Sequence, residues 1–168
     1  SDMAIGLSGM FGFTICENFN YPYSAVSIRD FWKRWHMSLT TWFREYVYFA
    51  LGGNRRGKVR TILNRLFVFF LTGLWHGANW SYVVWGGING LYQVIGRMTL
   101  GVRQKVRAFL HIKEDAFWLR VIQMFITFVL ASFAWLFFRA DGMGHAVDLI
   151  RYSISNGVIL QQFTDGTI

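Results

Sequence analysis

His76 is the residue whose type and setting most favour chemistry. It lies in a segment, Leu66 to Gly96, that contains no Asp, Glu, Lys or Arg. An ionisable side chain in such a stretch is costly to bury and is a functional hypothesis by default. Partial burial favours the neutral imidazole, which can accept a proton, and Gly77 leaves room for a substrate. The residues alone support a catalytic base and a structural histidine, hydrogen-bonded between helices, about equally.

His36 is the second candidate, in the sequence FWKRWHMSL. At helical spacing Lys33 would lie beside it and disfavour its protonation, so the residues alone favour a structural role. His111 and His145 stand beside charged, loop-like sequence, and we expect both to be solvated.

Other familiar chemistries lack their motifs. The sequence has no HExxH, no Cys-His metal spacing, no Gly-x-Ser-x-Gly and no phosphate-binding glycine loop. Cys16 is the single cysteine, so no intrachain disulfide can form, and we expect a small apolar residue in a packed segment. The glycine-rich, basic run 51–57 indicates a cytoplasmic turn, although its cations could also attract an anionic carrier protein or cofactor.

Two apolar segments must position these histidines. Val121 to Phe138 is uncharged and would form a helix ~27 Å long, close to the roughly 30 Å of a bilayer core. Leu66 to Gly96 would be ~46 Å long as one helix, which is too long for a simple crossing. Its glycines therefore predict a bent or re-entrant pair of short helices, with His76 near the turn or the midplane.

The charges support a membrane protein. Only 15% of the residues are charged, against about a quarter in soluble domains, and the net charge is +8. Two basic clusters flank the segment that contains His76: Arg55, Arg56, Lys58, Arg60 and Arg65 before it, and Arg97, Arg103, Lys105, Arg107 and Lys113 after it. If both clusters are cytoplasmic, the segment between them crosses twice or not at all. The same placement argues against nucleic-acid binding.

The remaining elements are expected as follows. Aromatic residues at helical spacing predict one amphipathic helix over 27–48, capped by Ser27 with Asp30 and stopped by the glycines at 52 and 53. The polar tail 141–168 predicts a short surface helix and a loop, with Val147, Leu149, Ile150, Ile154 and Ile159 as its apolar residues. The apolar stretch 3–15 begins almost at the first residue, and we interpret both ends as truncations.

Several motifs together resemble the membrane-bound O-acyltransferase family, and its alginate O-acetylation branch in particular. The motifs are NFNYPY at 18–23, RDFWKRWHMSL at 29–39, WFREY at 42–46, LGGNR at 51–55, GLWHGA at 73–78 and FAWLFFRA at 133–140. The teichoic-acid D-alanyl transfer proteins are similar relatives. Glu45 stands where the family often has Asp. The resemblance implies that residues 1–168 are part of one all-α, polytopic membrane bundle, with short or re-entrant helices around the catalytic histidine.

The resemblance also implies a function. His76 would be the catalytic histidine, and His36 the family's other histidine, near the donor side of a tunnel. The expected reaction moves an acetyl or other acyl group onto a hydroxyl of an exported or cell-surface polysaccharide, with His76 as general base. Trp75 and Asn79 could donate hydrogen bonds to the oxyanion.

The expected setting is a multi-pass protein of the cell (inner or plasma) membrane. No bound cofactor or metal is expected, and the acyl donor, such as acetyl-CoA or an acyl-carrier thioester, would be a substrate. The expected partners are the bilayer, a donor or carrier protein and an extracytoplasmic polysaccharide-modifying protein. D-alanyl transfer to teichoic acid, a transporter and a non-catalytic scaffold are the alternatives.

Overall fold

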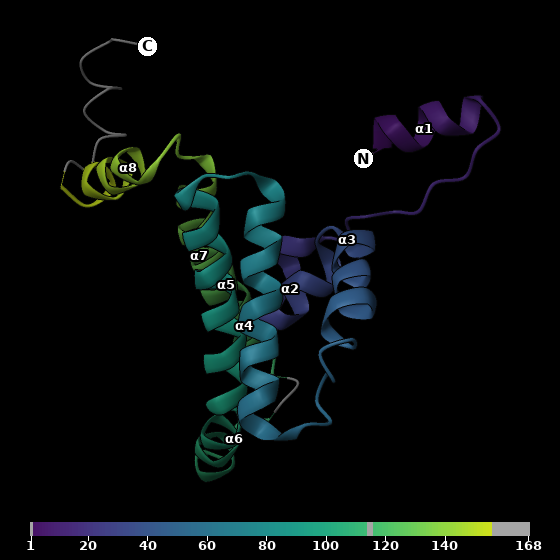
Figure 1. Ribbon diagram of the computed structural model, residues 1–168. Helices are drawn as coiled ribbons and strands as arrows, with labels where there is room; N and C mark the ends of the chain where they lie inside the picture. Colours follow the sequence, from purple (N-terminus) through teal and green to yellow (C-terminus); the bar gives the residue numbers. More distant parts are fainter. Residues whose placement is uncertain (1, 114–115, 156–168) are drawn as a thin grey trace.

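Within the residues that the structure describes, 2–113 and 116–155 of a computed structural model, every regular element is a helix. The elements are α1 (Asp2–Met10), η1 (Pro22–Ser24), α2 (Ile28–Arg34), α3 (Met37–Trp42), η2 (Phe43–Tyr48), α4 (Gly57–His76), α5 (Trp80–Met98), α6 (Leu100–Phe109), α7 (Phe117–Arg139) and α8 (Met143–Ser155). Figure 1 shows α4, α5 and α7 as long neighbouring helices, with α1 apart from them. The all-α prediction is confirmed.

The centre of the fold is the hairpin of α4 and α5, which turns at residues 77–79. Glycines bring the two backbones together: a Cβ added at Gly73 would collide with the carbonyl oxygen of Tyr82, and one added at Gly86 with that of Phe69. The predicted break in the apolar segment is therefore confirmed. The helices have 20 and 19 residues, longer than expected, because α4 begins within the basic cluster.

Helix α7 is the one helix in the described part of the chain that is long and apolar enough to cross a membrane. It covers the predicted span and packs against α5 through small residues, among them Ala131 and Ala134. Only 22% of its apolar window is buried, so most of its large side chains face outward. A core helix of a soluble protein would be mostly covered, and this exposure therefore favours contact with lipid.

The single α-helix predicted over 27–48 is wrong, because the chain breaks between α2 and α3 and continues after α3 as a π-helix. Ser27 does cap α2, accepting a hydrogen bond from the Asp30 N–H at 3.1 Å. After α2, Trp35 is extended and His36 is left-handed, with φ 46°, before α3 begins. The region from 43 onward is a π-helix, η2, a form that is frequent at functional sites.

An earlier segment, residues 18–20, stabilises the break between α2 and α3. The N–H of Asn20 donates to the Arg34 carbonyl at 2.9 Å, and the Met37 N–H donates to the Asn18 carbonyl at 3.0 Å. The Asn18 side chain also accepts from the N–H and hydroxyl of Ser38, at 2.9 and 2.6 Å. These bonds satisfy backbone groups that an uninterrupted helix would have satisfied by itself.

Two smaller expectations have different outcomes. The predicted surface helix in the tail is confirmed as α8, although Ile159 and the rest of 156–168 lie outside the described residues. Cys16 was expected in a packed segment, and that expectation is wrong. It lies in a non-helical stretch between α1 and η1, and its side chain is exposed.

Candidate active site

His76 is the last residue of α4, at the tip of the hairpin. Its ring is surrounded by aromatic rings from three helices, with centroids 4.8 Å from Trp75, 5.2 Å from Trp85, 5.0 Å from Phe138 and 6.3 Å from Tyr82. The side chain is half-buried. The rings leave part of the imidazole accessible and shield the rest from water.

Gly77 keeps this tip compact. Its φ of 154° is rarely adopted by residues with a side chain, and an added Cβ would lie 2.8 Å from the Tyr82 ring. Gly77 was predicted to leave room for a substrate. In the structure, the Tyr82 ring occupies that space. His76 was predicted near the turn or the midplane, and the structure places it at the turn.

His36 also contacts Trp75. The centroid of its ring is 6.3 Å from that of Trp75 and 6.0 Å from that of Phe19. Its Nδ1 is buried and has no hydrogen-bond partner among the described residues. The structure thus brings both predicted histidines to one indole, although 40 positions separate them in sequence.

A buried layer of aromatic side chains supports the tip. Trp85 is only 1% exposed, and its ring packs against those of Trp32, Trp135 and Phe138. Trp32 Nε1 donates to Asn89 Oδ1 at 3.2 Å, and Asn89 Nδ2 donates to the Trp85 carbonyl at 2.9 Å. This network fixes α2 against α5 and so fixes His36 relative to His76.

Sequence reasoning missed Asn89, which is 3% exposed. The signal was present, because an amide within an apolar stretch needs a polar partner as much as a histidine does. The partner itself, Trp32, could not be read from the sequence.

Replacing Trp32 by Phe is expected to reduce the free energy of unfolding by about 1–3 kcal/mol, because buried Asn89 Oδ1 loses its donor. The measurement is the thermal midpoint of the full-length protein in detergent. Trp118→Phe is the matched control, since Trp118 is 51% exposed on α7. Adding Asn89→Leu to Trp32→Phe should recover part of the loss. Equal midpoints for Trp32→Phe and Trp118→Phe would contradict the role of this hydrogen bond.

Asn79, suggested as a donor to the oxyanion, makes two structural hydrogen bonds. Its Oδ1 accepts from the Ser81 N–H at 3.1 Å and caps α5, while its Nδ2 donates to the Asp141 carbonyl at 3.3 Å. Asn79 therefore holds the hairpin tip to the end of α7.

The other two histidines agree with the expectation that they are solvated. His145 is exposed and lies 3.7 Å from the Asp141 carboxylate. His111 is exposed in a turn, with φ 52°.

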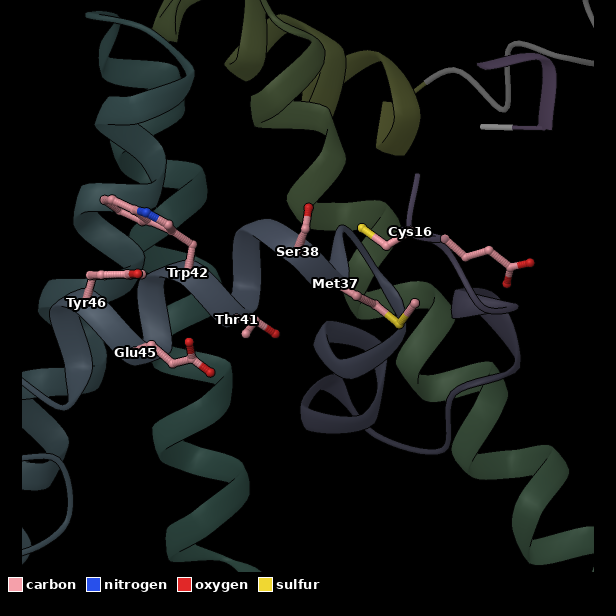
Figure 2. A pocket seen from close by; sticks show the side chains of 8 residues that line it. Cys16, Met37, Ser38, Thr41, Trp42, Glu45 and Tyr46 are labelled. Carbon is pink, nitrogen blue, oxygen red and sulfur yellow. The ribbon is translucent and has the colours of Figure 1, made fainter. Parts of the chain in front are cut away.

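The protein also has an open cleft, whose lining includes Met37, next to His36 in the chain. It has a volume of about 420 Å³ and is lined by Cys16, Glu17, Met37, Ser38, Thr41, Trp42, Glu45 and Tyr46. Figure 2 shows Trp42, Glu45 and Tyr46 following one another along the helix, with Met37 and Cys16 at the other side of the cleft. Glu45 is exposed and its carboxylate lies 3.4 Å from the guanidinium of Arg44.

The sequence matches a known class of membrane protein. The sequence profile of the membrane-bound O-acyltransferase family matches residues 1–139. The chain belongs to this family, and it is therefore part of a membrane protein.

Individual relatives narrow the comparison. The chain is 46% identical over 143 residues to the probable alginate O-acetylase AlgI of Pseudomonas aeruginosa, covering 85% of this chain and 25% of the relative. It is 36% identical over 160 residues to the peptidoglycan O-acetyltransferase of Helicobacter pylori, covering 95% and 29%. It is 30% identical over 149 residues to the teichoic acid D-alanyltransferase of Bacillus subtilis, covering 84% and 37%. The chain thus spans about a quarter to a third of these relatives.

Proposed function

We propose that the full-length protein containing this chain is a multi-pass O-acyltransferase of the cell membrane, which moves an acetyl group onto a hydroxyl of an exported or cell-surface polysaccharide. The carrying observation is the half-buried His76 at the tip of the α4–α5 hairpin, ringed by aromatic side chains, in a chain of this family. Relatives named for O-acetyl transfer are more similar to the chain than those named for D-alanyl transfer.

In the proposed reaction His76 takes the proton of the acceptor hydroxyl as that oxygen attacks the carbonyl carbon of the acyl donor. For a thioester donor such as acetyl-CoA or an acyl-carrier protein, the tetrahedral intermediate then collapses with cleavage of the C–S bond. The imidazolium returns its proton to the leaving sulfur. The products are an ester and a thiol, so His76 ends in its starting state.

His36 is proposed as the second histidine of the site. Both histidines contact Trp75, so His36 would contact the donor while His76 contacts the acceptor. Among the described residues, its buried Nδ1 has no hydrogen-bond partner. An extracytoplasmic partner protein could receive the acyl group before the polymer does.

The distribution of charge supports an acceptor outside the cytoplasm. The first basic cluster lies around the start of α4, and the second runs from the end of α5 through α6. Both lie at the end of the bundle where α6 is seen in Figure 1. The positive-inside rule assigns that end to the cytoplasm. His76 lies at the opposite end, against Phe138 near the end of α7. This end would face the exported polymer.

Cells that produce the full-length protein are expected to carry base-labile acetyl esters on their surface polymer, and cells lacking it are not. The measurement is to release the esters from the surface polymer with mild alkali, and then to quantify acetate and D-alanine separately. Release of D-alanine alone would contradict acetyl transfer and would indicate that the protein transfers D-alanyl groups. Equal amounts of both in the two strains would instead support a transporter or scaffold.

A further inference from the structure

A large groove lies at the end of the bundle far from His76. It has a volume of about 920 Å³ and is formed by side chains from α2, α4, α5, α6 and α7 together with the segment before α2. Its α7 wall is a stripe of apolar residues at helical spacing: Leu119, Ile122, Ile126 and Leu130. Val102 and Val106 of the amphipathic helix α6 face the same groove.

The charged lining of this groove has one sign. Its charged side chains are the arginines at 29, 65, 97, 103 and 107, and the described lining contains no carboxylate. They come from four different helices or their flanks, so they converge on the groove and do not form a run along one helix. Arg103 also donates to the Gly96 carbonyl at 2.6 Å, which holds α6 against the end of α5.

The depth of the groove agrees with half a membrane. From Leu119 to Leu130 the α7 wall is about 16 Å long, and one leaflet of the bilayer core is roughly 15 Å thick. The arginines at 97 and 103 flank the α5–α6 junction, at the end where the cytoplasmic surface was placed. Arg65 lies about 12 Å along α4 from the first residue of that helix. Its charge is therefore deeper in the membrane than a cation at the level of the lipid headgroups.

We propose that this groove binds one anionic phospholipid of the cytoplasmic leaflet. The acyl chains would lie along the α7 stripe, and the phosphate would accept hydrogen bonds from the guanidinium groups of Arg29 and Arg97. A bilayer supplies such a molecule at the required depth and orientation. The proposal concerns how the protein is held and stabilised in its membrane, and it does not depend on the proposed acyl transfer.

The test compares two lipids on the full-length protein in detergent. Phosphatidylglycerol and phosphatidylcholine with identical acyl chains are titrated, and binding is followed by native mass spectrometry. Phosphatidylglycerol is expected to bind more tightly. The double variant Arg29→Gln/Arg97→Gln should weaken its binding by about 30-fold, at about 1 kcal/mol for each cation near the membrane surface. Binding of phosphatidylcholine should be unchanged.

The matched control is Arg55→Gln/Arg56→Gln, which removes the same charge from exposed residues outside the groove. It should change phosphatidylglycerol binding less than about threefold if specific contacts, and not net charge, determine affinity. Equal losses in the two double variants would overturn the proposal, as would equal binding of the two lipids. Complete displacement of phosphatidylglycerol by millimolar inorganic phosphate would also overturn it, because the groove would then be an anion site without a lipid.

Discussion

Replacing His76 by alanine in the full-length protein is expected to lower acetyl transfer to the surface polymer by about 10²- to 10⁴-fold, the usual contribution of a positioned general base. Alanine cannot accept the hydroxyl proton, so the attacking oxygen would have to react while still protonated. The aromatic side chains around position 76 also pack against one another, Trp85 with Phe138 and Tyr82 with Phe138, and should hold the hairpin tip together. The measurement is base-labile acetate per cell at matched membrane levels of the protein.

A pair of asparagine variants separates chemistry from packing. His76→Asn retains a polar side chain of similar size but cannot act as the base, so it should lose activity as His76→Ala does. His111→Asn makes the same change at an exposed turn residue with φ 52°, a conformation that asparagine tolerates, and should keep full activity. Full acetylation by His76→Asn would show that the histidine is structural and would remove the proposed mechanism.

The sequence could predict the helices that depend on local pattern. The uncharged run in α7 and the glycines of the α4–α5 hairpin are signals within a single stretch, and both predictions agree with the structure. The basic clusters likewise predicted that the two ends of the apolar segment would return to the same side. The antiparallel hairpin explains that pattern.

The break at His36 could not be predicted in this way. The spacing of aromatic residues from 27 to 48 is helical on both sides of the break, so periodicity alone favours one helix. What interrupts the helix is a segment about 14 to 20 positions earlier, whose Asn18 and Asn20 bond to the exposed backbone groups. Such a contact depends on tertiary structure. It also gives His36 its left-handed backbone and turns its ring toward Trp75.

The meeting of the two histidines at Trp75 has the same origin. His76 was predicted near the turn or the midplane, from the glycines and the apolar character of its segment. Its distance to His36 depends on how α2 docks on α5, through the buried contact of Trp32 with Asn89. The family resemblance indicated that both positions matter, but only the packing of α2, α5 and α7 explains how they share one site.

Gly86→Ala is expected to destabilise the protein more than any other single methyl group added to the hairpin interface. The new Cβ would collide with the backbone carbonyl oxygen of Phe69, and neither helix backbone can move away without separating α4 from α5. Overpacking of this kind costs about 1–3 kcal/mol or more. The thermal midpoint in detergent should fall, and acetyl transfer should fall with it, because the tip of the hairpin carries His76.

The neighbouring glycine gives a control with the opposite sign. A Cβ added at Gly87 meets no atom within 4 Å, so Gly87→Ala faces no collision and gains helix propensity, which stabilises by about 0.5–1 kcal/mol. The two variants add the same methyl group at adjacent positions. Only the contact with α4 distinguishes them. A lower midpoint for Gly86→Ala with an unchanged or higher one for Gly87→Ala would place the close helix contact on the Gly86 face. Equal midpoints for the two variants would mean that the α4–α5 backbones do not touch there, and that the aromatic side chains alone set the position of His76.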